Sequence, residues 1–200
     1  MPSPAATKFL QSLGRAEVLR ATRIPSGSPK EVSSKRQVYY HAALAASVAA
    51  WDAYLNQIVL DFYNVTANPL DAAYHSLHAS ARAVAESALK KFNTPNWENS
   101  RNLLVLHTGF DPLPHWVWPA QRMAVAHVQE RLNQILKVRH SFAHGFQIPS
   151  FSWTQSPKGS VRLAVEGLRF NERLFRHLVR KTDKEMSAFV SKNYGVMTRW

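Results

Sequence analysis

Hydrophobic residues recur at helical spacing along most of the chain. The clearest case is the segment 35–65, in which apolar and aromatic side chains return every three or four positions from Tyr40 to Phe62 and cover most faces. A helix that is apolar nearly all round belongs in the centre of a bundle. The pattern therefore predicts a long central helix over residues 35–65.

Shorter amphipathic helices are predicted on both sides of the central one. They cover residues 4–21, 69–92, 97–107, 120–144 and 171–194. The segment 25–34, rich in proline and serine, is typical of a linker. We therefore divide the chain into an N-terminal helix with its linker, residues 1–34, and a helical domain, residues 35–200.

The pattern changes before the last helix. Phe151 and Trp153 alternate with polar residues, and the alternation resumes at Val161 and Leu163 after the turn-forming residues 156–159. Two alternating stretches joined by a short turn predict a β-hairpin. The expected fold class is all-α: an antiparallel helical bundle with a short β-hairpin or loop insertion before the last helix.

Composition narrows the class of protein. The chain has 200 residues and 46% hydrophobic content, enough for one core, and its lack of cysteine excludes disulfides and thiolate metal sites. The first residues have no apolar stretch of the kind a secretory signal carries. The longest apolar run, 42–51, has about half the length of a membrane span. We expect a cytoplasmic protein with no membrane partner.

Charge points to an anionic partner. The chain carries 25 Lys and Arg against 13 Asp and Glu, a formal net charge of +12. Such a field raises the encounter rate and the weak affinity for polyphosphates, so nucleic acid is the first candidate. On charge alone, a basic surface that binds no partner is an equally good interpretation.

The most informative pair of polar residues is Arg139 with His144, which stand five positions apart and are followed by Gly145. Arginine offers a fixed cationic fork for phosphate oxygens, and histidine exchanges protons near neutral pH. Together they suffice for phosphodiester chemistry without a metal. The other histidines show no convincing metal-ligand spacing, so we expect no metal and no cofactor.

Arg139 also continues an apolar stripe, because Val128, Leu132 and Ile135 precede it at spacings of four, three and four residues. A buried guanidinium needs a partner. The candidate is Asp52, the only formally charged residue between positions 38 and 60. We expect a salt bridge or a shared polar site between Asp52 and Arg139, and an inert buried ion pair is the structural alternative.

His144 should point away from Arg139, by roughly 140° on an ideal helix. Two arrangements would bring both side chains to one phosphate: a last turn loosened at Gly145, or a two-fold dimer that joins two copies of the pair. His140, beside the arginine, either orients the site or is a polar residue on the helix surface.

These residues resemble a known family. The segment 136–145, with Arg139 and His144, resembles the Arg-x4-His signature of the HEPN superfamily, especially its RiboL-PSP-like branch. The segment 42–58 is similar to the family's early core helix, and 91–96 and 108–111 are similar to its middle connections. The resemblance extends over about residues 35–149.

The resemblance implies a homodimeric helical bundle that cleaves RNA without a metal. Arg139 and His144 match the two defining positions, His140 matches the variable polar position, and Asp52 takes the place of a more usual glutamate as a supporting residue. Some HEPN toxins have a tyrosine two positions after the histidine that a nucleotidyltransferase modifies. The corresponding residue here is Phe146, so that partnership is not implied.

The sequence therefore favours a metal-independent endoribonuclease, a toxin or antiphage effector that acts in a homodimer cleft. An antitoxin or a defence-system protein is a possible partner. The alternative is a non-catalytic HEPN-like module that binds nucleic acid or nucleotide and dimerises in such a system. A basic helical DNA-binding protein is a weaker alternative, because no helix-turn-helix recognition segment is evident.

Overall fold

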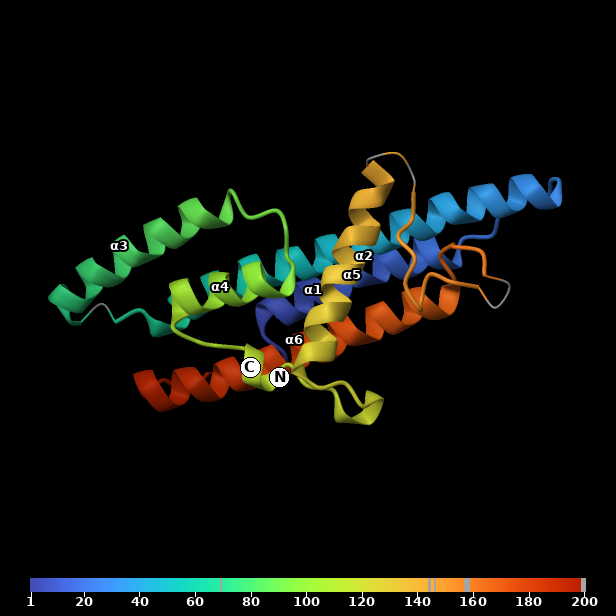
Figure 1. Ribbon diagram of the computed structural model, residues 1–200. Coiled ribbons are helices and arrows are strands. Elements are labelled where there is room, and N and C mark those ends of the chain that lie inside the picture. Colours follow the sequence, from blue (N-terminus) through green and yellow to red (C-terminus); the bar gives the residue numbers. More distant parts are fainter. Residues whose placement is uncertain (69, 144, 146, 157–158, 199–200) are drawn as a thin grey trace.

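The computed structural model describes residues 1–68, 70–143, 145, 147–156 and 159–198. Within them the chain forms a helical bundle without strands (Figure 1), which confirms the all-α expectation. Its α-helices are α1 (Pro4–Ala21), α2 (Pro29–Thr66), α3 (Ala72–Leu89), α4 (Trp97–Thr108), α5 (Val125–Ala143) and α6 (Val165–Tyr194). Two short 3-10 helices, η1 (Leu113–His115) and η2 (Pro119–Gln121), lie between α4 and α5.

The central helix α2 begins earlier than the hydrophobic pattern predicts, inside the segment assigned to the linker. Ser28 caps it: the Ser28 hydroxyl accepts from the Glu31 amide, and the Glu31 carboxylate accepts from the Ser28 amide at 2.9 Å. Pro29 occupies the first turn, where its missing N–H costs nothing. Serine followed by proline is thus a helix start here, and only 22–28 remain as a connection.

Other helix ends are also set by caps. The Asp71 carboxylate accepts from the Tyr74 amide at 2.9 Å, so α3 starts at Ala72 rather than at residue 69. Pro69 itself lies outside the described residues. At the end of α4, Gly109 takes the left-handed conformation with φ +73°, as its position after the periodic segment predicts.

The predicted β-hairpin is a loop. Residues 151–155 turn on themselves, because the Phe151 carbonyl accepts from the amides of Thr154 and Gln155. Beyond the turn, the Arg162 amide donates to the Thr154 carbonyl at 2.7 Å, and a single antiparallel bridge joins Gln155 to Val161. Of the two predicted forms, a β-hairpin or a loop insertion, the structure therefore has the loop insertion. Residues 157–158 lie outside its described part.

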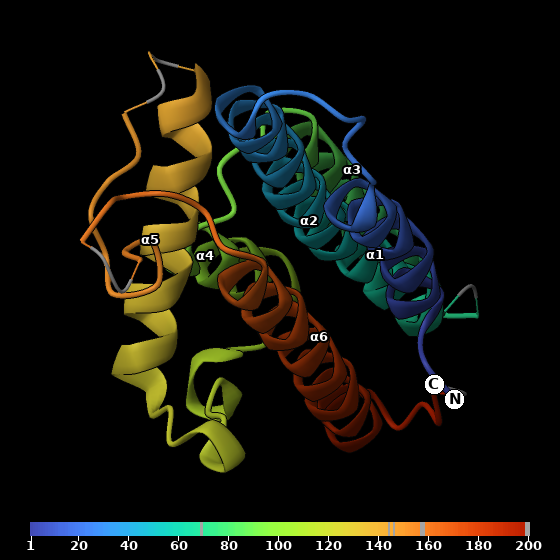
Figure 2. The same cartoon turned by 90° about the vertical axis from the view of Figure 1, so that its right-hand side faces the viewer.

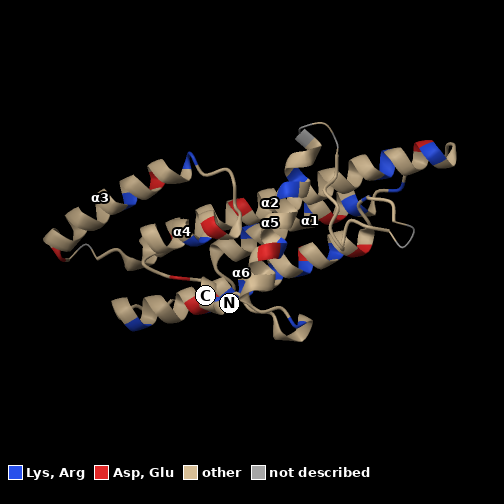
Figure 3. Ribbon diagram, in the orientation of Figure 1, with Lys and Arg blue, Asp and Glu red and all other residues tan. Residues whose placement is uncertain are grey.

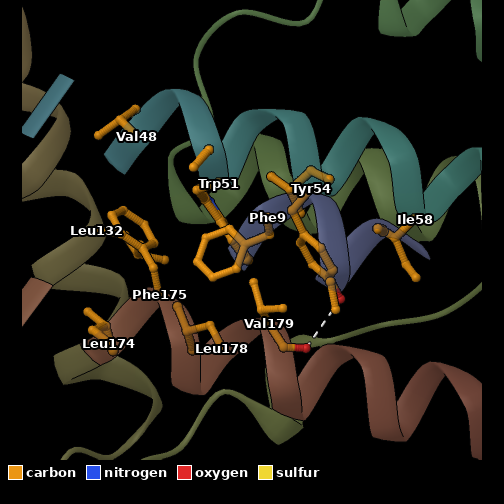
Figure 4. Close-up of a cluster of buried hydrophobic side chains, with 14 of the residues drawn as sticks. Phe9, Val48, Trp51, Tyr54, Ile58, Leu132, Leu174, Phe175, Leu178 and Val179 are labelled. Atoms are coloured by element: carbon orange, nitrogen blue, oxygen red, sulfur yellow. Dashed lines mark hydrogen bonds between the residues drawn. The ribbon is translucent and has the colours of Figure 1, made fainter. Parts of the chain in front are cut away.

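The core is centred on Trp51 of α2, which is fully buried. Its ring lies 5.6 Å from that of Tyr54 and 5.8 Å from those of Trp116 and Phe175, measured between centroids. Figure 4 shows these α2 and α6 side chains filling the space between the two helices. The Tyr54 hydroxyl donates to the Val179 carbonyl at 3.3 Å, which ties α2 to α6.

Helix α1 packs into the same core. Phe9 and Leu13 are buried, and the Ser3 amide and hydroxyl both donate to the Asp183 carboxylate of α6, at 2.7 and 2.5 Å. Helices α1, α2 and α6 run beside one another, and α5 crosses them steeply (Figure 2). The N-terminus and the last described residues of the chain lie close together in both views.

By length and composition, α2 could cross a membrane. In the structure, 56% of its most apolar 18-residue window is buried inside the bundle. The core helix of a globular protein has the same two properties, and the packing of Trp51 accounts for the apolar character of α2.

Candidate active site at the end of α5

Helix α5 presents Arg139 to solvent. Val128, Leu132 and Ile135 are buried as predicted, but the stripe continues through Val138, which is fully buried, while Arg139 is exposed. The prediction that Arg139 lies on the buried stripe is therefore wrong. With 3.6 residues per turn, positions 138 and 139 lie on either side of the stripe, and only one of them can face the core.

Asp52 of α2 is close enough for its charge to interact with that of Arg139, although the two form no salt bridge within 4.0 Å. Its side chain is half-buried, and Oδ1 is a buried oxygen without a hydrogen-bond partner among the described residues. Burial raises the pKa of Asp52, and the positive charge of Arg139 opposes that rise only in part. The predicted salt bridge between Asp52 and Arg139 is not formed, and the alternative, a shared polar site, stays a prediction.

The last turn of α5 is described as far as Ala143, and Gly145 follows with φ +108°. This backbone conformation favours glycine, in keeping with the helix end predicted there. His140 is half-buried on α5 and interacts with neighbouring residues. His144 and Phe146 lie outside the described residues, so the direction of His144 relative to Arg139 stays a prediction.

The structure adds a second histidine to this region. His41 of α2 is buried and stacks on Phe142, with ring centroids 5.0 Å apart and an angle of 24° between the planes. Burial lowers the pKa of His41, which favours the neutral ring. A sequence signal existed: His41 stands eleven residues before Asp52, about three helical turns, so both lie on one face of α2.

Positive charge is concentrated near the end of α5 and along α6 (Figure 3). Two ion pairs join α6 to α1: Glu172 of α6 pairs with Arg20 of α1 at 2.8 Å, and Arg176 of α6 pairs with Glu17 of α1 at 2.6 Å. Further cations line a pocket of about 750 Å³ between α1 and α6, which has an apolar floor; they include Arg173, Arg180 and Lys184. Among the described residues, no group of three or more His, Asp or Glu side chains is arranged to hold a metal ion.

The arrangement is suited to anion chemistry. An exposed guanidinium at a helix end can bind phosphate oxygens through its N–H fork. A half-buried carboxylate on the neighbouring helix adds an electrostatic partner for that guanidinium. Of the four residues predicted from the sequence, Arg139 lies close enough to Asp52 for their charges to interact, His140 follows Arg139 on α5, and His144 lies outside the described residues.

Comparison with known proteins adds one match. The family model described as RiboL-PSP-HEPN matches residues 20–185, well over half of the chain, and this range includes α2 to α5 and most of α6. Neither the curated proteins nor the solved structures contain a match. The family match agrees with the helical bundle, and the matched range contains the Arg-x4-His segment. The chain belongs to the RiboL-PSP-HEPN family.

Proposed function

We propose that this protein is a metal-independent endoribonuclease whose catalytic residues are Arg139 and His144. HEPN domains are typically ribonucleases or nucleotide-binding modules. The observation that carries the choice is the position of Arg139, which is exposed at the end of α5 beside Asp52 and belongs to the Arg-x4-His segment. A solvent-facing arginine there is available to a substrate phosphate.

The proposed reaction is attack by a ribose 2′-hydroxyl on the neighbouring phosphorus. His144 takes the proton from the 2′-hydroxyl, the 2′ oxygen forms a bond to phosphorus, and the bond to the 5′ oxygen breaks. The Arg139 guanidinium stabilises the negative charge that builds up on the phosphate oxygens. The leaving 5′ oxygen takes up a proton, so the products are a 2′,3′-cyclic phosphate and a 5′-hydroxyl end.

We place this chemistry in a homodimer. HEPN domains generally dimerise and bind RNA. A two-fold dimer would join two copies of Arg139 and His144 in one cleft, which removes the need for one helix to aim both side chains at one phosphate. A protonated His144 from the second copy could then supply the leaving oxygen with its proton.

The test is incubation of the purified protein with total RNA in the presence of EDTA, followed by mapping of the product ends. We expect cyclic phosphate and 5′-hydroxyl ends, and no cleavage of DNA, because the nucleophile is the 2′-hydroxyl. His144→Ala should lose the activity and keep its oligomeric state. Cleavage that EDTA stops, or cleavage of RNA with methylated 2′ oxygens, would contradict the mechanism.

Asp52→Asn is expected to have different effects on the stability of the fold and on the rate of RNA cleavage. Because the pKa of Asp52 is raised in the folded state, the folded protein loses stability as the pH rises from about 3.9, the ordinary value, through the folded-state pKa. At neutral pH the wild type has lost all of this stability, because the carboxylate is ionised in a half-buried position. Asparagine carries no charge and avoids the loss. The variant should therefore be as stable as the wild type or more stable at neutral pH.

The same variant should cleave RNA more slowly, by up to about tenfold, because Arg139 loses the negative charge beside it. Chemical denaturation at neutral pH and near pH 3.5, together with cleavage rates at neutral pH, checks both effects. A destabilised variant with normal cleavage would instead make Asp52 a purely structural partner of Arg139.

A non-catalytic nucleic-acid-binding module is the second candidate, and the cations that line the pocket between α1 and α6 favour it. Such a module would retain RNA without cutting it, and His144→Ala would change nothing. If the wild-type protein binds labelled RNA and cleaves none of it, this second candidate is the correct one.

A further inference from the structure

Arg131, on the face of α5 toward the start of α6, has no acidic partner within the described ranges of the chain. The carbon of its guanidinium lies 4.3 Å from the centroid of the Trp153 ring and 5.0 Å from that of Phe170. Its Nε donates to the Asn171 side-chain oxygen at 2.8 Å. Among the described residues, no carboxylate lies within 4.0 Å of it. A partly buried arginine normally has such a counter-charge.

The free part of this guanidinium faces a pocket. Arg131 lines the adjoining cavity, and its two terminal nitrogens make no hydrogen bond with the described residues. Burial lowers the pKa of Arg131 to about 10, and the group therefore keeps its charge at neutral pH. Two rings stack on the flat group, which leaves its N–H edge for a ligand.

The pocket itself is built for an anion. It has a volume of about 520 Å³ and lies between α5, the loop before α6 and the start of α6. Arg162 supplies a second positive charge, Ser152 supplies a hydroxyl, and Glu166 is the one acidic residue among its described lining residues. Two arginines against one carboxylate leave the cavity positive.

Two contacts hold the pocket in shape. The Trp153 indole Nε1 donates to the Gln134 side-chain oxygen at 2.9 Å, which fixes the ring against α5. On α6, a Cβ at Gly167 would lie 3.1 Å from the Trp153 carbonyl oxygen, so glycine allows the loop to approach the helix closely. The ring that stacks on Arg131 is therefore positioned without a ligand.

We propose that this cavity, the Arg131 pocket, binds the phosphate group of a nucleotide, either within an RNA strand or in a free mononucleotide. The paired N–H groups of arginine match two phosphate oxygens, and the aromatic walls accommodate an adjoining base or sugar. Arg131 stands eight residues before Arg139 on the same helix, about 12 Å along its axis. If the ligand is an RNA strand, a case that rests on the proposed ribonuclease function, the pocket binds the substrate at a distance from the cleavage point.

The experiment measures binding separately from cleavage. Wild type, Arg131→Gln and Arg162→Gln are titrated with a 2′-O-methyl RNA oligonucleotide, with a nucleoside 5′-monophosphate and with inorganic phosphate. We expect Arg131→Gln to weaken binding about tenfold or more, and Arg162→Gln, at the exposed rim, to weaken it less. Arg15→Gln is the matched control: it removes the same charge from an exposed position on α1, outside the pocket, and should bind as the wild type does.

Each outcome has one meaning. Loss of oligonucleotide binding alone identifies an RNA strand as the ligand, and loss of monophosphate binding identifies a free nucleotide. Equal affinities of the wild type and both pocket variants overturn the proposal, and so does an equal loss in Arg15→Gln. If Arg131→Gln unfolds, as thermal melting would reveal, the result for Arg162→Gln decides. A wild type that never cleaves RNA but needs Arg131 to bind it refutes the ribonuclease function and leaves the pocket standing.

Discussion

Arg139→Ala is expected to lower the rate of RNA cleavage by about 10²–10³-fold, the usual loss when one preorganised donor to a developing oxyanion is removed. The side chain is exposed, so its loss opens no cavity in the core, and thermal stability should hardly change. Single-turnover cleavage of a labelled RNA, with excess enzyme, measures the effect on the chemical step.

Two variants at the end of α5 serve as controls for this prediction. Arg139→Lys keeps the charge but loses the two-pronged geometry, so its rate should fall between those of wild type and Arg139→Ala. Lys137→Ala removes a neighbouring exposed charge from the same helix and should cleave nearly as fast as the wild type. Equal losses for Lys137→Ala and Arg139→Ala would mean that Arg139 acts only through net charge.

Trp51→Ala should have the largest effect on stability, a loss of about 3–5 kcal/mol in the free energy of unfolding. The indole is fully buried and touches the rings of Tyr54, Trp116 and Phe175, so alanine would leave a cavity between α2 and α6. Because a domain of this kind is stable by about 5–15 kcal/mol, the variant would lose a large part of its stability. Urea denaturation followed by circular dichroism measures the change.

The control for this substitution is Val18→Ala, at a residue of α1 that is 68% exposed, which should change stability by less than about 0.5 kcal/mol. Trp51→Phe should cost less than Trp51→Ala, because it keeps an aromatic ring and removes a buried indole nitrogen that has no hydrogen-bond partner in the described part of the chain. A loss below about 1 kcal/mol for Trp51→Ala would show that the core can close around the missing ring.

Much of the helical fold follows from local signals. The hydrophobic period of 35–65 places Trp51 in the centre of a bundle, and the first helix lies at Pro4–Ala21, where the pattern predicts it. The errors occur where one local signal has two meanings. Ser28 and Pro29 are turn residues and also a helix start, and only the hydrogen bonds with Glu31 decide between them.

The candidate site was less predictable. A shared polar site of Arg139 and Asp52 could be expected, since Asp52 is the only charged residue between positions 38 and 60 and Arg139 continues an apolar stripe; in the structure the charge of Arg139 acts on the pKa of Asp52. The exposure of Arg139 could not, because a stripe with 3.6 residues per turn does not decide between positions 138 and 139. That choice depends on the angle at which α5 crosses α2.

The sequence by itself determined the helical class, the central place of Trp51, the family signature at Arg139 and the helix end at Gly145, because periodicity, caps and short motifs are local properties of the chain. Only the tertiary structure decided which residues from distant segments meet. It stacks His41 on Phe142, and it assembles the Arg131 pocket from α5, the 151–164 loop and α6. Such contacts depend on how whole helices pack, and no sequence spacing specifies that geometry.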